Sequence, residues 1–67
     1  MLNSEKRAIE FEALVADIQA LATEVKGMSW ENEERTAQGQ SLAYPKRYFD
    51  EKAGQIRVIS AELRALK

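Results

Sequence analysis

Four carboxylates recur at seven-residue intervals in this chain, at Glu10, Asp17, Glu24 and Glu31. In a helix this spacing places them in one row. Paired carboxylates act as general acid and base only in a pocket that excludes water and shifts their pKa values. One helix offers no such pocket, and metal sites in helical bundles draw ligands from several helices. We interpret the row as a solvated helix flank, with attraction of a basic partner as the alternative.

The composition excludes several function classes. The 67 residues include no Cys and no His, so disulfides and the usual zinc ligand sets are excluded. Ten Lys and Arg against eleven Asp and Glu give a net charge of −1. This balance is not typical of a protein that holds nucleic-acid phosphates. We therefore expect no enzymatic activity, no cofactor and no metal.

One cluster combines aromatic and basic side chains. Tyr44, Tyr48 and Phe49 lie around Lys46 and Arg47 in the sequence. Aromatic rings beside basic residues can stack on single-stranded nucleic acid. Two basic residues make a small electrostatic footprint, so we favour a structural role for the cluster and keep a small nucleic-acid-binding regulator as an alternative.

The helix that must carry the carboxylates has two apolar faces. One face has the alternating three- and four-residue spacing of a coiled-coil seam: Phe11, Leu14, Ile18, Leu21, Val25 and Met28. The opposite face carries small residues between two large ones: Ile9, Ala13, Ala16, Ala20, Thr23, Gly27 and Trp30. A surface helix needs one apolar face. The pattern therefore predicts a helix that is sandwiched or that binds a partner.

The remaining sequence predicts a second helix and a turn. Gly39 is typical of a helix C-terminus and Pro45 of a helix start. We predict an all-α fold, an antiparallel coiled-coil-like two-helix hairpin able to assemble into a dimeric helical bundle. The single domain 1–67 comprises a helix over about 4–38, a loop over 39–44 and a helix over 45–66. Gly27 either lies inside a continuous first helix, which we favour, or ends it.

The second helix repeats the two-faced pattern. Its large seam residues are Phe49, Ile56, Ile59, Leu63 and Leu66, and its small face is Gly54, Val58, Ala61 and Ala65. An antiparallel register with four consecutive apolar layers pairs Leu66 with Ile18, Leu63 with Leu21, Ile59 with Val25, and Ile56 with Met28. This register places Lys52 opposite Asn32 and Phe49 opposite Arg35.

The predicted register leaves part of the first helix uncovered. The overhang contains Ile9, Phe11, Leu14 and Val15, and an exposed apolar patch usually marks an interaction site. If the helix breaks near Gly27 instead, the second helix covers Phe11. Trp30 either is a binding hot spot or caps the core near the loop. The predicted partner-binding residues, which include those of a homo-oligomer, are Ile9, Phe11, Leu14, Ala16, Ala20, Trp30, Gly54, Ala61 and Ala65.

The segment 39–66 contains Gly-Gln-Ser-Leu-Ala-Tyr, then Tyr-Phe, then Ile-Arg-Val-Ile-Ser-Ala-Glu-Leu-Arg-Ala-Leu. It resembles the small helical accessory, or orphan, proteins of lambda-like temperate phages. That resemblance implies a non-enzymatic effector that binds a host or phage protein. The layout is also similar to the helical-hairpin co-chaperones of type III secretion needle subunits, which implies the alternative of shielding another helix from aggregation.

The sequence also predicts where the protein acts. The first residues lack the apolar region of a signal peptide, and the longest apolar run is far short of a membrane span. We therefore expect a cytoplasmic protein, in the bacterial host if a phage encodes it, without a membrane partner.

Overall fold

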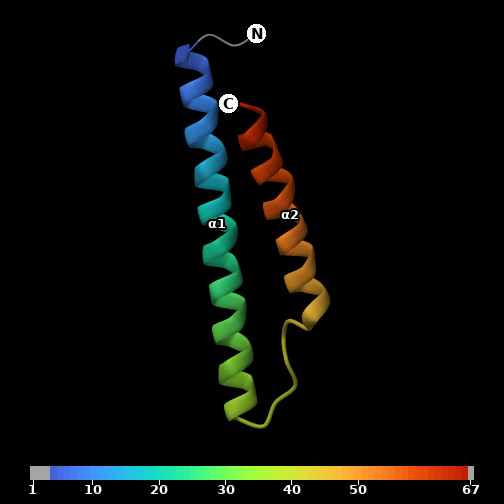
Figure 1. Cartoon of the computed structure of the whole chain (residues 1–67). Helices are drawn as coiled ribbons and strands as arrows, with labels where there is room; N and C mark the ends of the chain where they lie inside the picture. Colours follow the sequence, from blue (N-terminus) through green and yellow to red (C-terminus); the bar gives the residue numbers. More distant parts are fainter. Residues whose placement is uncertain (1–3, 67) are drawn as a thin grey trace.

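The computed structural model describes residues 4–66 as two antiparallel helices packed side by side (Figure 1). Helix α1 spans Ser4–Ala37 and helix α2 spans Lys46–Ala65. The described residues contain no strand. The predicted all-α two-helix hairpin is therefore confirmed, and each helix ends one residue short of its expected limit next to the loop. No helix within the described range combines the length and apolar character that crossing a membrane requires.

Helix α1 runs without interruption through Gly27, so the continuous first helix is confirmed. The backbone angle φ at Gly27 is not positive. A Cβ atom built on Gly27 would have no neighbouring atom within 4 Å. Neither backbone conformation nor close packing within one chain therefore requires glycine at this position.

The turn begins with a glycine C-cap. Gly39 has a φ of 73°, in the left-handed region that only glycine adopts without strain. The amide of Gln40 donates to the carbonyl of Arg35, and the amide of Gly39 donates to the carbonyl of Thr36. These two bonds form the Schellman motif that satisfies carbonyls at the end of α1. Pro45 occupies the N-cap of α2, one residue before the helical position predicted for it.

The register of the hairpin differs from the prediction. The Lys52 ammonium lies 2.8 Å from the Glu24 carboxylate, and Leu66 lines a cleft together with Phe11. The predicted register, which set Leu66 opposite Ile18, is therefore wrong. Helix α2 lies one heptad, or about 10 Å, closer to the N-terminus of α1. In Figure 1 the yellow loop accordingly runs back along α1 before α2 begins.

The observed register buries more apolar surface than the predicted one. The Lys52–Glu24 ion pair and the cleft shared by Phe11 and Leu66 fix this register. Extended along both helices, it pairs Phe11 with Leu66, Leu14 with Leu63, Ile18 with Ile59, Leu21 with Ile56, Val25 with Lys52, and Met28 with Phe49. Five layers are apolar instead of four, and Phe49 moves from Arg35 onto Met28. The loop of residues 38–45 is long enough to allow this shift. Leu14, expected in an exposed overhang, is buried instead, and Val15 is half-buried beside the seam.

The core between the helices is thin. Only Leu14 and Met28 are buried among the described residues, at 7% and 5% of their full exposure. The other seam residues, such as Ile18 and Ile59, are half-buried, except Phe11, which is exposed. The hairpin measures 54 × 16 × 11 Å, so the molecule is one helix thick in its smallest dimension.

The register predicts which engineered cysteines will form a disulfide. We expect Leu14→Cys with Leu63→Cys to cross-link under mild oxidation, because these positions lie in one layer. The matched pair Leu21→Cys with Leu63→Cys lies in one layer only in the register predicted from sequence. Thiol titration and non-reducing electrophoresis measure both, and the natural chain contributes no cysteine. Preferential cross-linking of the second pair would contradict the observed register.

The environment of Gly27 predicts a stabilising substitution. Gly27→Ala should raise the free energy of unfolding by up to about 1 kcal/mol, because alanine loses less backbone entropy in a helix. Urea denaturation of dilute protein measures the change. A loss of stability would show that Gly27 contacts another backbone closely.

Candidate protein-interaction surfaces

The row of carboxylates forms one face of the hairpin, which we call the acidic face: Glu10, Asp17, Glu24 and Glu31. Glu24 binds Lys52 across the two helices, and Glu31 accepts a 2.9 Å hydrogen bond from the Arg35 guanidinium. The hydrogen bond to Glu24 raises the pKa of Lys52 above its ordinary value, although partial burial opposes the shift. Lys52 therefore stays charged at neutral pH and brings one polar layer into the seam.

The carboxylates do not form a metal centre within residues 4–66. No group of three acidic side chains in that range is arranged to hold an ion. Two of the four residues of the acidic face are held in ion pairs, which is the geometry of a charged helix flank.

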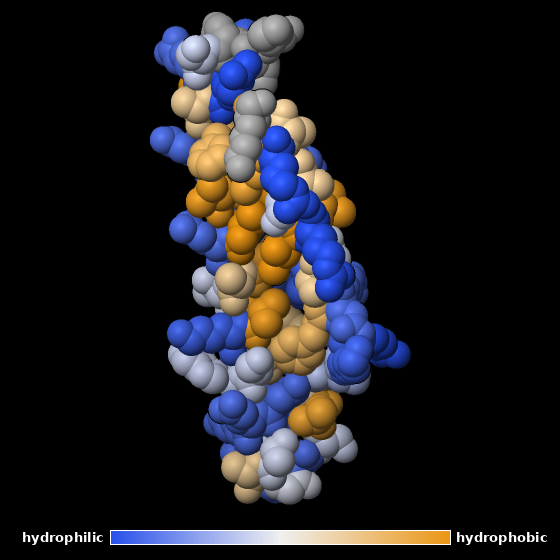
Figure 2. Space-filling model, viewed as in Figure 1, coloured by the Kyte–Doolittle hydropathy of each residue, from blue (hydrophilic) through white to orange (hydrophobic). Residues whose placement is uncertain are grey.

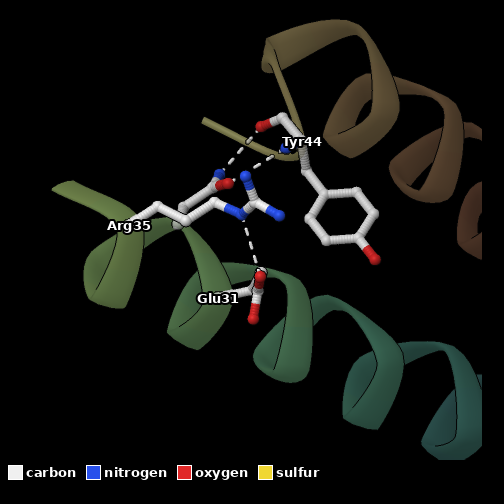
Figure 3. A network of polar contacts seen from close by, with 4 residues as sticks. Glu31, Arg35 and Tyr44 are labelled. Carbon is white, nitrogen blue, oxygen red and sulfur yellow. Dashed lines mark hydrogen bonds and ion pairs between the residues drawn. The ribbon is translucent and has the colours of Figure 1, made fainter. Parts of the chain in front are cut away.

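The loop is attached to α1 by one amide side chain (Figure 3). Asn32 donates to the Tyr44 carbonyl at 2.8 Å and accepts from the Tyr44 amide at 3.0 Å. This pair of bonds occupies both polar backbone groups of Tyr44, as a neighbouring strand would. The Glu31–Arg35 ion pair lies beside it on α1. Asn32 therefore fixes the point at which the loop returns to α1.

The aromatic and basic cluster packs against itself. The rings of Tyr44 and Tyr48 lie edge to face, with centroids 6.1 Å apart. The Arg47 guanidinium lies 5.0 Å from the Tyr48 ring centroid, and Lys46 binds Asp50 at 2.7 Å. Both tyrosine rings therefore have contacts within the hairpin, at its loop end.

The outer face of α1, on the side away from α2, carries two widely exposed large residues. Ile9 and Trp30 each expose 62% of their surface, and Ala16 and Ala20 between them are also exposed. The Lys26 ammonium lies 5.4 Å from the Trp30 ring centroid. Trp30 therefore lies outside the core, which excludes the predicted alternative in which it caps the core.

The outer face of α2 is smaller and less uniform. Val58 is 60% exposed, and Ala61 and Ala65 are exposed beside it. Gly54, predicted with them, is half-buried.

A cleft opens at the end of the hairpin distant from the loop. It has a volume of about 380 Å³, and its lining includes Phe11, Leu66 and Ala8 with the polar Arg7 and Glu12. Phe11 remains 44% exposed there. Leu14, predicted to bind a partner beside Phe11, is instead buried against α2, because the register shift covers it.

The seam is open to solvent along one side, which we call the open face. Figure 2 shows its hydrophobic side chains as a continuous band between the helices, with hydrophilic side chains along both edges. Helical geometry places small or apolar residues beside the seam on the side opposite the acidic face: Ala8, Val15, Ala22 and Ser29 from α1, and Ala53 and Ser60 from α2. Sequence reasoning missed this face, although the same seven-residue spacing marks it.

Comparison with known proteins adds no relative. No protein-family model, curated protein or solved structure matches the chain.

The Asn32 contact predicts a measurable effect on stability. Asn32→Ala should lower the free energy of unfolding by about 1–2 kcal/mol, because two hydrogen bonds are lost and the loop is released. Thr23→Ala is the matched control, since Thr23 bonds only to the Gln19 carbonyl of its own helix. That control should be neutral or slightly stabilising. Equal losses in both variants, measured by urea denaturation, would contradict the role of Asn32.

Proposed function

We propose that this chain is a non-enzymatic protein–protein interaction module, an accessory or regulatory protein of the temperate-phage kind that acts in the cytoplasm of the bacterial host. It binds a host or phage protein through the outer face of α1, and it also associates with a second copy of itself. The observation that carries the proposal is the exposure of Trp30 and Ile9 on one helix face, on the side away from α2.

The outer face of α1 has the features of a helix-binding surface. Ile9 and Trp30 are separated by three heptads, so they lie on the same side of the helix. The residues between them, including Ala16 and Ala20, are small enough to let the backbone of another helix approach closely. Tryptophan is enriched among residues that contribute most to binding energy. A partner helix would rest on the small residues and be held at both ends.

The charged residues around the outer face of α1 favour a partner with basic residues. Glu10 and Asp17 lie along one edge of the outer face, and Glu12 lies along the other near Ile9. Lys26 is held over the indole of Trp30. Glu10 and Glu12 outnumber Lys6 among the charged residues around Ile9, which favours a partner helix with basic residues at that end.

Replacing the indole tests this proposal. Trp30→Ser should reduce retention of a partner from bacterial lysate at least about tenfold, as expected for a hot-spot residue. Val58→Ser is the matched control, because Val58 is equally exposed but lies on α2. Mass spectrometry identifies the retained protein, and calorimetric titration with the purified partner measures the affinity of both variants. Equal binding by both variants, or equal loss in both, would contradict the proposal.

A further inference from the structure

The hairpin exposes more surface than a compact monomer of its mass. Its accessible area is 5240 Å². A folded monomer of 7.6 kDa exposes about 4300 Å². The excess of about 900 Å² is close to the roughly 800 Å² that each partner contributes to a standard protein interface. The chain therefore carries about one interface more than the hairpin itself uses.

The open face shows where that excess lies. A two-helix seam needs apolar residues at two positions in each heptad, whereas a helix in a larger bundle needs three. Helix α1 supplies the third position with Ala8, Val15 and Ala22, on the side opposite the acidic face. Helix α2 has small side chains at this position, the apolar Ala53 and the polar Ser60. Both helices thus leave room for further helices to pack against them, and both do so on the same side.

We infer that a second copy of this chain packs on the open face, so that two hairpins form an antiparallel four-helix bundle with its twofold axis parallel to the helices. The inference rests on the self-association in the proposed function and adds the face, the direction and the register. In this arrangement α1 of one copy lies beside α2 of the other, with Val15 opposite Ser60 and Ala22 opposite Ala53. The half-buried seam residues become the core of the bundle.

Charge complementarity selects this arrangement. The edge of α1 beside the open face carries Glu12, Gln19 and Lys26, and the corresponding edge of α2 carries Asp50, Arg57 and Arg64. Rotation about an axis parallel to the helices leaves every residue at its height along the bundle. The residues of α1 that meet α2 of the second copy at equal height are therefore Glu12 with Arg64, Gln19 with Arg57, and Lys26 with Asp50. Each charged pair joins opposite signs and occurs twice in the dimer.

The competing arrangement has less favourable charges. If the twofold axis ran across the helices, α1 would lie antiparallel to α1 and α2 to α2. Glu12 would then face Lys26 of the second copy, and Asp50 would face Arg64 of the second copy. This arrangement has as many attractive pairs, but it also sets the Arg57 side chains of the two copies against each other. Like charges at close range oppose association. Within one chain Glu12 and Arg64 lie on opposite edges of the hairpin, so a functional link between them reports contact between two copies.

A charge exchange tests the arrangement by sedimentation equilibrium of the full chain. Glu12→Arg and Arg64→Glu should each weaken the dimer about tenfold or more, because each turns two attractions into two repulsions. The double variant Glu12→Arg with Arg64→Glu should restore the dimer to within about threefold of the natural affinity. Absence of restoration, or restoration by Glu12→Lys with Lys26→Glu instead, would overturn the inferred axis.

A matched pair of substitutions tests the face itself. Ala22→Glu places a carboxylate on the open face and should weaken the dimer at least about a hundredfold. Ala20→Glu places the same side chain on the outer face of α1, and it should leave the dimer intact while it disrupts partner binding there. Both alanines are exposed in the single hairpin, so neither change should unfold it.

The outcomes separate the inference from the proposed function. A dimer that resists Ala22→Glu but dissociates with Ala20→Glu would overturn the open face as the contact and leave self-association standing. A monomer at all concentrations up to about 1 mM would overturn both the inference and self-association. Partner binding through Trp30 would remain, because it is measured on a different face.

Discussion

The contact between two helices is a line, and the apolar stripe of this chain is wider than that line. Side chains that lie directly between the helices lose most of their exposure, as Leu14 and Met28 do. Side chains one position away remain half-exposed however well the pair packs. Most hydrophobic stabilisation comes from area removed from water, so a thin core leaves a short chain with little stability. The shape of the hairpin, its register and its unused faces all follow from this limit.

The register of the hairpin is set by the need to bury as many apolar side chains as possible in this thin core. The acidic face repeats every seven residues, so Lys52 would find a carboxylate both in the observed register, at Glu24, and one heptad away, at Glu31. The ion pair therefore cannot discriminate between the two registers. The apolar layers can, because only the observed register covers Leu14 with α2. The bond between Asn32 and the backbone of Tyr44 then holds the loop at the matching position.

The existence and direction of both helices could be predicted from the sequence, because their apolar residues follow the helical period and Gly39 marks the turn. Continuity through Gly27 could be predicted for the same reason, since helix formers lie on both sides of it. The register could not, because periodic patterns look alike after a shift of seven residues and the route of the loop depends on tertiary contacts. The burial of Leu14 was therefore missed together with the register. The exposure of Ile9 and Trp30 could be predicted, because both residues lie on the side of the helix opposite the seam.

The faces of the hairpin differ in composition, and the proposed function and the inferred bundle give each face a different task. The acidic face is charged and partly held in ion pairs, so water solvates it at little cost. The open face continues the seam and has edges of complementary charge on α1 and α2, which matches a second copy of the same chain. The outer face of α1 presents an indole and an isoleucine separated by small residues. In the inferred bundle this outer face points away from the twofold axis on both copies. Dimerisation would therefore display two identical partner-binding faces on opposite sides of one bundle, and a partner with two copies of its binding helix would gain from effective concentration as well as from direct contact.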